Sequence, residues 1–593
     1  MNTLDQLNEK EKPIDKIPVV IMPPVDVKAL IEEDEKDVKQ DNEYIAKPFR
    51  FGYAIDVDID IKKDGFKKEF SNGDKLWLLK IHSADALSIN LIYDNFKLGK
   101  GSKFYIYNED RTEELGAFTP ESCNNKDNVF ATYLVQGDTI TLEYYEPSSD
   151  DNGVIHINKV IHGYRALGDS APCNIDVMCS LGSNWRNQQR AVCMILLNQN
   201  TWLGSGCLIN NTSEDFKPYV LTARHIFFDV AGNIPNSPAT CLYVFKYWRQ
   251  TCGWGNPINY YVIQGATLRA QYAPSDFALL ELNIPKLPAE WNLYYAGWDR
   301  DTLPASDATL IHHPKGDAMK ISHDSSPVVS GSVSASDLPV PVSVWVAHYK
   351  QGTVQPGSSG APMFNSSKRI VGQHCVSPPS NDNNTTACNI GTYERRGAAG
   401  KFDISWSGGG TLGTRLFDFL APLGGVAPAE LDGIGEPFIS GPDVIYVPNT
   451  GFTFVNPPPG TITWEVTGYF TLSPSTGGTT YVTPTNPSGS GTLRVRVNGT
   501  VRDEKTITAS VLTVYGPDYI NNVMSASFVI VPTISGASYL WEDGRFAEIT
   551  SGHNDPLAIY YVPYGAGTGY DYIGCNVKIN GVDIYVYKRI QII

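Results

Sequence analysis

Short runs of alternating apolar and polar residues, ended by Gly, Pro or Asp, recur along most of the chain and constrain its fold. Clear examples are residues 75–83 (KLWLLKIHS) and 87–96 (LSINLIYDNF). Period-two alternation is typical of a strand with one buried face, and Gly and Pro favour the turns between strands. With 53 Gly and 39 Pro among 593 residues and few helical patterns, the sequence indicates an all-β protein. This length needs several hydrophobic cores, so we expect several domains.

Changes in composition predict five parts. Residues 1–45 mix Pro, Glu, Asp and Lys without periodicity, which predicts a flexible leader. Residues 46–168 form a β-rich domain, and residues 169–428 form a second one that closes with a predicted short helix in RLFDFLAP (415–422). Beyond a linker rich in Gly, Pro and Ala, residues 437–514 and 515–593 each place a Trp, Trp464 or Trp541, on a predicted strand. That pattern favours two successive small β-sandwiches.

Charge and hydropathy exclude two classes of partner. The net charge of −16 and the pI near 5.1 argue against nucleic acid, since phosphate binding needs a basic surface. No apolar stretch reaches the length of about 18 residues that a membrane span requires. We therefore expect neither a nucleic-acid partner nor a membrane-spanning segment.

The ten cysteines point to an oxidising compartment. Six of them lie between Cys173 and Cys252, without the CxxC spacing of a zinc or redox site. Disulfide bonds are therefore the favoured interpretation, and they form outside the reducing cytosol. The N-terminus, MNTLDQLNEKEKPIDK, has no apolar signal segment. We expect that a signal peptide was removed and Met1 added, and that the protein is secreted or lies at the cell surface.

Three short segments of the 169–428 region carry the residues of a nucleophilic site. His225 ends an apolar run in YVLTARHI (219–226), Asp276 precedes one in APSDFALLEL (273–282), and Ser359 lies in the turn of QPGSSGAPMF (355–364). A Ser hydroxyl becomes nucleophilic when an imidazole takes its proton, and a buried carboxylate holds that imidazole in the right tautomer. The order and flanks of these segments predict a His225–Asp276–Ser359 catalytic triad.

Two glycines beside Ser359 predict how the backbone assists the reaction. Gly357 permits a turn in which the N–H groups of Gly357 and Ser359 converge on a developing oxyanion. One such donor is typically worth about 2.7–4 kcal/mol of transition-state stabilisation. We expect Gly360 to leave room for the substrate backbone beside the nucleophile.

These segments resemble those of a known family. The segments TARH (222–225), SDFALLEL (275–282) and PGSSGAP (356–362) resemble the triad motifs of trypsin-like serine peptidases, and in particular of the bacterial lysyl endopeptidases. Non-catalytic motifs of that family are also present in the same order: CNIDVMC (173–179), AGWDR (296–300), IHHP (311–314), KIS (320–322), RIVGQ (369–373) and SWSGGG (405–410).

The resemblance implies a fold, a mechanism and a maturation route. Residues 173–425 would form two six-stranded antiparallel β-barrels with the triad in the cleft between them, and peptide bonds would be hydrolysed through an acyl-enzyme without a metal or organic cofactor. Residues 46–165, ending in HGYR, resemble the propeptides of these proteases. We therefore expect a zymogen with a removable pro-domain that assists folding and blocks the cleft. The two C-terminal sandwiches resemble bacterial immunoglobulin-like modules.

The resemblance also implies two disulfides, Cys173–Cys388 and Cys179–Cys252. The other cysteines have no implied partner: Cys193 and Cys207 flank a predicted hairpin and could pair, Cys241 and Cys375 stay open, and Cys123 and Cys575 are expected to be free. The family usually has a Cys after the catalytic His, where this chain has Ile226, and the partner position falls near Gly204. One disulfide is therefore absent.

The specificity pocket departs further from the family. Lysine-specific members carry an Asp three residues before a Gly, and counting back from Gly400 that position is Gly397. The residue six before the nucleophile, at the pocket base of trypsin-like enzymes, is the uncharged Thr353. His374, with Thr353 or Arg396, could receive an acidic side chain. The sequence thus predicts a preference for acidic or uncharged residues over strict lysine specificity, although a shifted register would make Glu394 the selector.

Two other classes of function remain as alternatives. One is a binding protein built on an inactive protease fold; the intact triad disfavours it. The other is an adhesin acting through residues 437–593, whose tyrosines could contact glycans or cell surfaces (Tyr469, Tyr481, Tyr560, Tyr561 and Tyr570). We favour the interpretation that these are strand-forming residues. The His312–His313 pair is predicted to be structural, because neighbours on a strand point to opposite faces and cannot share a metal ion.

Overall fold

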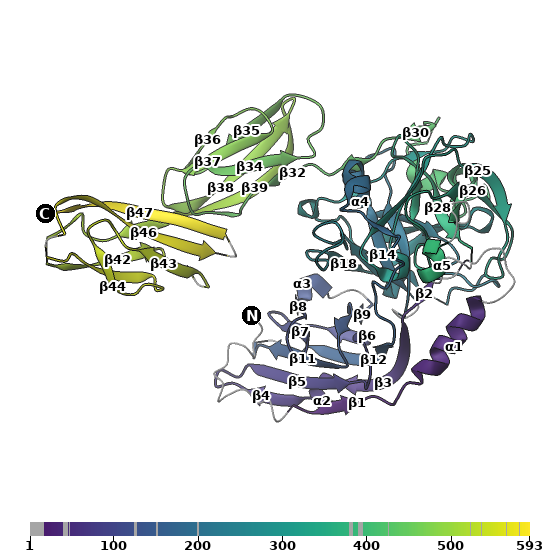
Figure 1. The fold of residues 1–593 in the computed structure, drawn as a ribbon, viewed down its shortest axis with the longest axis horizontal. Helices are drawn as coiled ribbons and strands as arrows, with labels where there is room; N and C mark the ends of the chain where they lie inside the picture. Colours follow the sequence, from purple (N-terminus) through teal and green to yellow (C-terminus); the bar gives the residue numbers. More distant parts are fainter. Residues whose placement is uncertain are drawn as a thin grey trace. The chain divides into compact units, whose positions relative to one another are not determined.

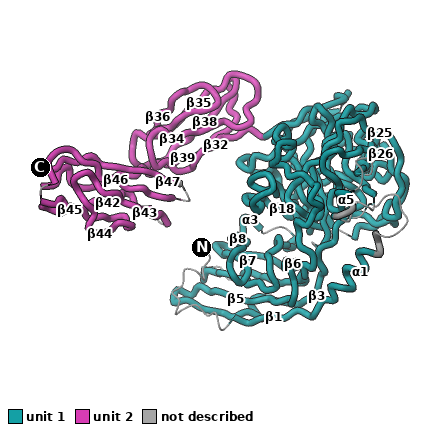
Figure 2. The backbone as a smooth tube through the Cα atoms, viewed as in Figure 1, with its two compact units in different colours: residues 1–435 teal, residues 436–593 magenta. Residues whose placement is uncertain are grey.

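The computed structural model divides the chain into two compact units, residues 1–435 and 436–593 (Figure 2). It describes residues 17–38, 46, 48–123, 127–149, 152–197, 201–235, 237–378, 384–389, 395–424, 426–521, 523–534, 536–564, 566–579 and 582–593. Strands dominate both units, so the predicted all-β class is confirmed. No helix among these residues is long and apolar enough to cross a membrane.

The first part of unit 1 is built from two sheets (Figure 1). One has the order β1-β5-β11-β7-β8, with β4 also paired to β5: Val19–Ile21, Lys75–His82, Thr139–Glu146, Lys103–Asn108, Glu114–Phe118 and Phe66–Glu69. The other has the order β10-β6-β12-β3, with β9 paired to β6: Val135–Gln136, Ser88–Lys97, Val154–Gly163, Gly52–Asp60 and Phe130–Ala131. Short helices α2 (Ile61–Asp64) and α3 (Pro120–Cys123) connect strands, and a shared apolar cluster lies between the sheets.

Part of the predicted flexible leader is structured. Strand β1 pairs in parallel with β5, and helix α1 spans Val27–Val38. Asp34 of α1 is buried; it lies 2.7 Å from Arg50 and 3.1 Å from Arg165, and accepts a hydrogen bond from Tyr164. The prediction of an unstructured leader is therefore wrong for residues 19–38. Composition alone could not show it, because the partners of Asp34 lie far away in the sequence.

The central region, residues 169–428, begins with a sheet that curls on itself. Its order is β18-β17-β14-β15-β16-β20-β19: Tyr261–Gln264, Leu242–Phe245, Val192–Leu197, Trp202–Leu208, Tyr219–Ala223, Phe277–Leu282 and Ala266–Tyr272. The two ends of this order, β18 and β19, follow each other in the chain across Gly265, which has φ +83°. The sheet therefore closes toward a barrel.

A second sheet completes the central region. Its order is β13-β24-β23-β27-β28-β29-β26-β25: Ile175–Asp176, Lys320–Asp324, Ala308–His312, Pro362–Phe364, Ile370–Val376, Arg396–Lys401, Val342–His348 and Val329–Val333. Strands β22 (Trp298–Asp299) and β30 (Glu430–Leu431) extend it, and β21 (Tyr294–Tyr295) pairs with β31 (Ile434–Gly435). The helices here are α4 (Arg186–Gln189), α5 (Asn384–Asn389), α6 (Phe402–Ser407) and α7 (Phe417–Leu420), the last of which is the predicted closing helix.

The N-terminal sheets and the central region share buried apolar surface. Strand β2 (Phe49–Arg50) pairs with the edge of β15. Phe49, Phe51 and Ile161 belong to one cluster with Met194 and Leu203 of the first central sheet. Burial of apolar area is the main source of such stability, so the two parts are held together by more than their covalent joint.

Unit 2 contains two β-sandwiches with the same strand order. The first pairs sheet β32-β34-β37-β36 (Phe438–Ser440, Thr450–Val455, Thr479–Pro484, Phe470–Ser473) with sheet β33-β39-β38-β35 (Val444–Ile445, Thr500–Ser510, Ser488–Val497, Ile462–Val466). The second pairs β40-β42-β45-β44 (Thr513–Tyr515, Ser525–Val531, Leu557–Tyr561, Glu548–Ser551) with β41-β47-β46-β43 (Tyr519–Ile520, Val582–Ile592, Gly569–Ile579, Ser538–Glu542).

The two tryptophans occupy equivalent places in these sandwiches. Trp464 lies in β35 and Trp541 in β43, and both are buried. Each indole N–H donates to a backbone carbonyl at 2.7 Å, Gly477 O in one case and Asp555 O in the other. Both predicted core tryptophans are therefore found in the core.

Candidate active site

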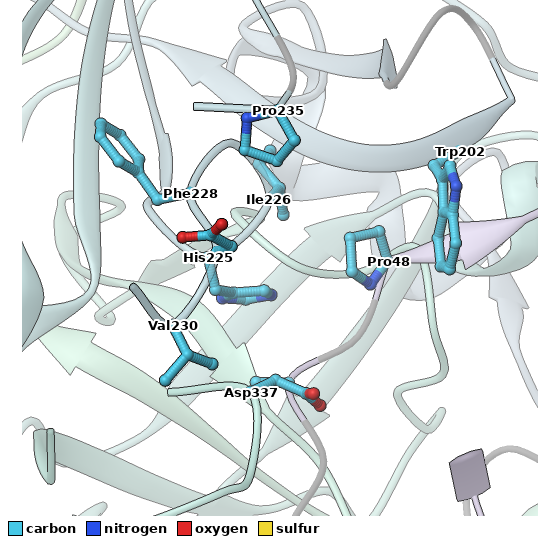
Figure 3. A pocket seen from close by; sticks show the side chains of 10 residues that line it. Pro48, Trp202, His225, Ile226, Phe228, Val230, Pro235 and Asp337 are labelled. Carbon is cyan, nitrogen blue, oxygen red and sulfur yellow. The ribbon is translucent and has the colours of Figure 1, made fainter. Parts of the chain in front are cut away.

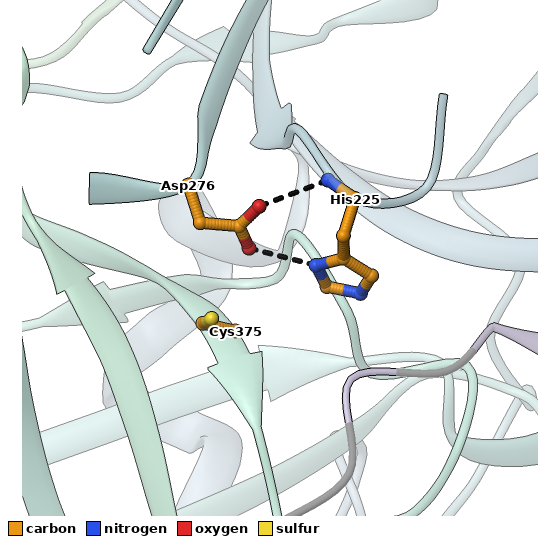
Figure 4. Close-up of side chains that lie close together, drawn as sticks. All are labelled: His225, Asp276 and Cys375. Carbon is orange, nitrogen blue, oxygen red and sulfur yellow. Dashed lines mark hydrogen bonds and ion pairs between the residues drawn. The ribbon is translucent and has the colours of Figure 1, made fainter. Parts of the chain in front are cut away.

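His225, Asp276 and Ser359 form one hydrogen-bonded chain. The Nδ1 of His225 lies 2.7 Å from Asp276 Oδ2, and its Nε2 lies 2.9 Å from Ser359 Oγ. The backbone N–H of His225 donates to Asp276 Oδ1 at 2.9 Å, so the carboxylate holds His225 at two points (Figure 4). The His225 and Asp276 side chains are only 1% and 2% exposed. With the Nδ1 proton directed at Asp276, Nε2 is placed to accept the proton of Ser359.

Strand ends position the three groups. His225 follows β16 by two residues, and Asp276 immediately precedes β20, which pairs with β16. Asp276 has the left-handed φ of +52°, and its carbonyl accepts from Arg224 N at 2.7 Å, which fixes this turn against the His225 segment. Ser359 comes from the turn before β27 in the second sheet. The site therefore lies where the two central sheets meet.

A cysteine supports the carboxylate. Cys375 is buried in β28. Its sulfur, a ring nitrogen of His225 and a carboxylate oxygen of Asp276 all lie within 4.8 Å of one another (Figure 4). Burial raises the pKa of this thiol, and the charge of Asp276 and a hydrogen bond with it raise the pKa further. The thiol is therefore protonated where it lies beside the Asp276 carboxylate.

His225, Asp276 and Cys375 also lie close enough together to be considered as metal ligands. A cysteine ligand must be a thiolate, which the raised pKa of Cys375 disfavours. Both oxygens of Asp276 are bonded to His225, and both ring nitrogens of His225 lie within hydrogen-bond distance of Asp276 or Ser359. These donors are engaged with one another, so the residues do not fit a metal centre.

Glycine is required on both sides of Ser359. Gly357 has φ +95°, and a Cβ there would lie 2.8 Å from His313 O and 2.9 Å from Lys315 N. Gly357 O accepts from Ser205 Oγ at 2.9 Å. The amides of Gly357 and Ser359 donate no hydrogen bond to any of the residues that the structure describes. The predicted oxyanion donors thus remain available to a ligand.

Gly360 has a different purpose from the predicted one. A Cβ at Gly360 would lie 2.1 Å from Thr222 Oγ1 and 2.3 Å from Ser205 O, atoms of the first sheet. The residue is therefore small so that the protein can pack against itself, and the expectation that it makes room for substrate is wrong. Ser359 O also accepts from Ser205 N at 2.7 Å, which ties the nucleophile turn to β15.

The predicted structural role of His312 extends to the nucleophile turn. His312 Nδ1 lies 2.7 Å from Ser358 Oγ, one residue before Ser359. Gln355 Oε1 in turn accepts from Ala171 N at 2.7 Å and from Asn174 Nδ2 at 2.9 Å, in the segment next to Cys173. Sequence reasoning missed both contacts, since nothing in either local pattern signals a distant partner. They link the predicted processing joint to the turn that carries Ser359.

The predicted pocket residues His374 and Gly397 lie together. A Cβ at Gly397 would lie 3.0 Å from His374 Cε1, 3.1 Å from Tyr349 Cε2 and 3.2 Å from Val354, the neighbour of Thr353. Among the described residues, Tyr349 Oη, Thr353 Oγ1 and His374 Nδ1 are buried without a hydrogen-bond partner. Burial lowers the pKa of His374 to about 3, so its imidazole is neutral.

Two further residues were considered for this pocket, Arg396 and Glu394. Arg396 lies in β29 opposite His348. Glu394, the alternative selector, lies outside the described residues. Tyr349 was not singled out in the sequence, because its nearness to Gly397 depends on the pairing of β26, which Tyr349 directly follows, with β29.

Both implied disulfides are present, Cys173–Cys388 and Cys179–Cys252. Cys193 and Cys207 are free and buried, so their suggested pairing is wrong. In the register of β14 and β15, Cys193 faces Gly206 and Cys207 faces Val192, which places the two thiols on opposite faces of the hairpin. Cys123 and Cys575 are free, as predicted, and so are Cys241 and Cys375. Gly204 and Ile226 stand at the two positions that the resemblance assigns to the absent disulfide. They lie close together, since a Cβ at Gly204 would be 3.3 Å from Ile226 Cδ1.

Residues 46 and 48–50 lie close to His225. Pro48 and Ala46 line a pocket of about 270 Å³ together with His225, Ile226 and Trp202 (Figure 3). Arg50 and Phe49 pair antiparallel with Trp202 and Leu203 of β15. Ala46 is 2% exposed and belongs to a cluster that includes Val376, one residue beyond Cys375. An extended piece of the chain's own N-terminal region therefore occupies space next to the triad.

Comparison with known proteins confirms the predicted resemblance for the central region. A family model described as "Lysyl endopeptidase, C-terminal domain" matches residues 167–391. A lysyl endopeptidase of Pseudomonas aeruginosa is 27% identical over 255 residues, which cover 38% of this chain. The chain spans about half, 52%, of that relative's length.

Two solved protease structures are also similar to this chain. The VesB protease of Vibrio cholerae is 12% identical, with 54% of this chain and 94% of that chain covered and a TM-score of 0.22. A Glu endopeptidase is 12% identical, with 40% and 93% covered and a TM-score of 0.23. The TM-scores are low, and we draw nothing more from these two likenesses.

Proposed function

We propose that this protein is a serine endopeptidase with His225, Asp276 and Ser359 as its catalytic triad. The observation that carries the proposal is the continuous chain of hydrogen bonds from Asp276 through His225 to Ser359 Oγ, assembled from two sheets. The match to lysyl endopeptidases over residues 167–391 supports the same reaction class. An intact triad also disfavours a binding protein on an inactive protease fold.

The geometry supports acyl transfer in two steps. Ser359 Oγ attacks the scissile carbonyl carbon as His225 Nε2 takes its proton, and the amides of Gly357 and Ser359 stabilise the oxyanion. His225 then gives the proton to the departing amine, which leaves an acyl-Ser359 ester. Water attacks the ester while His225 accepts one of its protons, and the acid product leaves as the proton returns to Ser359. Asp276 stabilises the imidazolium throughout.

The test is Ser359→Ala in the mature enzyme. The proposal expects kcat to fall to the residual rate that binding and the oxyanion donors sustain, a loss of about 10⁶-fold by analogy with other serine peptidases. Far-ultraviolet circular dichroism and the thermal midpoint should be unchanged, because the exchange removes one oxygen. A Ser359→Ala protein with near wild-type turnover would refute the triad.

We further propose that the enzyme is made as a secreted proenzyme whose residues 46–165 are a removable pro-domain. Pro48 beside His225 and the pairing of β2 with β15 support obstruction of the cleft. Phe49 and Phe51 share one buried apolar cluster with Met194 and Leu203, which should hold the pro-domain on the protease domain after cleavage. A chain cut only at the joint near residue 168 should stay associated with its pro-domain and inactive until that domain is degraded.

N-terminal sequencing of the active species tests this proposal. We expect a start between residues 166 and 173, with activity appearing only after the fragment 46–165 has disappeared from the preparation. A fully active species that starts before residue 160 would contradict processing.

The cleavage specificity is proposed to be for acidic or uncharged residues rather than strictly for lysine. Gly397 supplies no carboxylate at the position that selects lysine in the family. A neutral His374 and the hydroxyls of Tyr349 and Thr353 are buried hydrogen-bonding groups without a partner, and a buried carboxylate is stable only where such donors meet it.

Cleavage-site profiling on a denatured proteome tests this preference, with Glu394→Gln as the matched control. The proposal expects cuts after acidic or uncharged residues, unchanged by Glu394→Gln and weakened by His374→Ala. Cuts confined to the carboxyl side of Lys that disappear in Glu394→Gln would instead assign the selection to Glu394.

A further inference from the structure

The last sandwich carries a concentration of exposed tyrosines on one sheet. They lie on the outer side of β41-β47-β46-β43, which we call the tyrosine face. Alternate residues of a strand point to the same side, and the outward positions of this sheet include five tyrosines: Tyr519, Tyr570, Tyr572, Tyr585 and Tyr587. Their exposed fractions are 57%, 57%, 53%, 51% and 62%. Several exposed aromatic side chains gathered on one face of a protein are typical of a binding surface.

The rings are held in a defined arrangement. Tyr572 and Tyr587 meet edge to face at 5.7 Å, and Tyr585 lies 6.4 Å from Tyr587 at an interplanar angle of 31°. Tyr585 extends across Gly574, since a Cβ there would lie 2.0 Å from Tyr585 Oη. That hydroxyl donates to Glu542 Oε2 at 3.0 Å. Gly574 thus allows a tyrosine to lie flat along the sheet and expose its ring.

Polar groups alternate with the rings. The register places Gln591 opposite Tyr570, Arg589 opposite Tyr572 and Asn576 opposite Tyr585. The guanidinium of Arg589 lies 3.6 Å from the centre of the Tyr570 ring. The outward charged residues are balanced, two acidic and two basic: Glu542, Asp583, Lys578 and Arg589. A surface without excess charge does not select a phosphate-rich or strongly ionic ligand.

The equivalent sheet of the first sandwich shows that the fold does not require tyrosines there. Sheet β33-β39-β38-β35 has the same strand order, but its outward positions form ion pairs. Arg494 Nε lies 2.5 Å from Glu504, and Arg496 Nε lies 2.8 Å from Glu465. Strand formation alone therefore does not account for the tyrosine face.

We propose that the tyrosine face binds a neutral polysaccharide. Sugar rings present C–H groups on their faces and hydroxyls around their edges. The tyrosine rings offer apolar faces to the C–H groups, and the exposed side chains of Gln591 and Arg589 offer hydrogen bonds to the hydroxyls. A charge-balanced surface of half-exposed rings matches such an uncharged chain. This site is independent of the proposed peptidase activity, and it would hold the enzyme near glycan-coated protein.

Depletion assays with the full chain test this proposal. The probes are insoluble cellulose, chitin and β-1,3-glucan, with casein-coated beads as the protein surface. We expect binding to at least one polysaccharide and a loss of affinity of about tenfold or more in Tyr572→Ala/Tyr587→Ala, because two exposed anchors are removed. The matched control, Arg494→Ala/Glu504→Ala on the first sandwich, should bind within about twofold of the wild type, as expected for exposed ion-pair residues.

The readouts separate this proposal from folding and from the peptidase. Turnover of a short soluble peptide should be the same in the tyrosine variant and the wild type, and so should the thermal midpoint of unfolding. Absence of binding to all three polysaccharides overturns the proposal, as does binding that the tyrosine variant retains. Retention on casein beads that the same variant loses, without polysaccharide binding, would assign the face to a protein partner instead.

Discussion

The proposed catalytic cluster, His225, Asp276 and Ser359, and the tyrosine face differ most in how much of each side chain water reaches. His225 and Asp276 are 1% and 2% exposed and bonded to each other, whereas Tyr572 and Tyr587 are 53% and 62% exposed. In the cluster the three side chains depend on one continuous chain of hydrogen bonds, so the loss of a single proton acceptor disables all of it. On the tyrosine face the rings lie side by side, so each ring contributes separately to the binding free energy.

This contrast explains why stability and function are coupled differently in the two places. The cluster is bound to the backbone of both central sheets through contacts such as His225 N to Asp276 and Ser205 N to Ser359 O. The tyrosines project from a sheet whose stability comes from the opposite side, where Trp541 and Tyr560 are buried. A change on the face should therefore alter binding alone, whereas a change in the cluster should alter chemistry through geometry.

The largest predicted effect is on chemistry. Asp276→Asn in the mature enzyme should lower kcat by about 10⁴-fold, because the amide favours the wrong imidazole tautomer. Tyr587→Ala measured beside it should leave kcat on a soluble peptide unchanged. A similar rate for Asp276→Asn and the wild type would break the contrast, since it would mean that the carboxylate does not orient His225.

A smaller effect is predicted on stability within the last sandwich itself. Trp541→Ala removes a side chain that is 0% exposed and should cost about 3–5 kcal/mol. Tyr587→Ala, on the opposite side of the same sheet, should stay within about 0.5 kcal/mol of the wild type. Urea unfolding of the full chain followed by tryptophan fluorescence measures both. Equal losses would show that the face is structural.

The third effect is a dependence on pH. Burial lowers the pKa of His374 to about 3 and of His313 to about 4, against about 6.5 in an unfolded chain. Their contribution to stability is therefore complete above about pH 6.5 and declines as the pH falls toward those lower values, because only the unfolded state gains the protons. The urea midpoint of Ser359→Ala should be lower at about pH 5 than at about pH 7.5.

Two further measurements check that the pH dependence comes from the buried histidines and not from the tyrosine face. His313→Gln in the same background should show a smaller shift of the midpoint, since one of the buried histidines with a lowered pKa no longer titrates. Polysaccharide binding should be the same at both pH values, because tyrosines stay protonated throughout this range. A midpoint that does not move between the two pH values would contradict the buried, neutral state of these histidines.

Much of the proposed catalytic site could be predicted because its signals are local. Each triad residue stands in a short segment with characteristic flanks, and the all-β class follows from period-two alternation. Gly360 was misjudged because its neighbours, Thr222 and Ser205, come from another sheet. The pairing of Cys193 with Cys207 was misjudged for a similar reason, because it depends on the register of two strands. Cys193 lies opposite Gly206, one residue away from Cys207.

The tyrosine face shows the opposite case. Among the tyrosines noted in the sequence, Tyr560 is buried and Tyr561 is half-buried, while Tyr572, Tyr585 and Tyr587 were not singled out. Alternation within β46 and β47 would have assigned the outward positions. That β46 and β47 pair, and which residues then face one another, depends on the register of the whole sandwich.

Covalent labelling of Ser359 is the most direct test of the central claim. The mature enzyme is treated with a peptidyl phosphonate, and the modified residue is mapped by mass spectrometry. We expect one label per chain, on Ser359, together with complete loss of activity, and little labelling in His225→Ala because the hydroxyl is no longer activated. Inactivation with the label on another residue, or equal labelling of Ser359 in His225→Ala, would contradict a triad built from His225, Asp276 and Ser359.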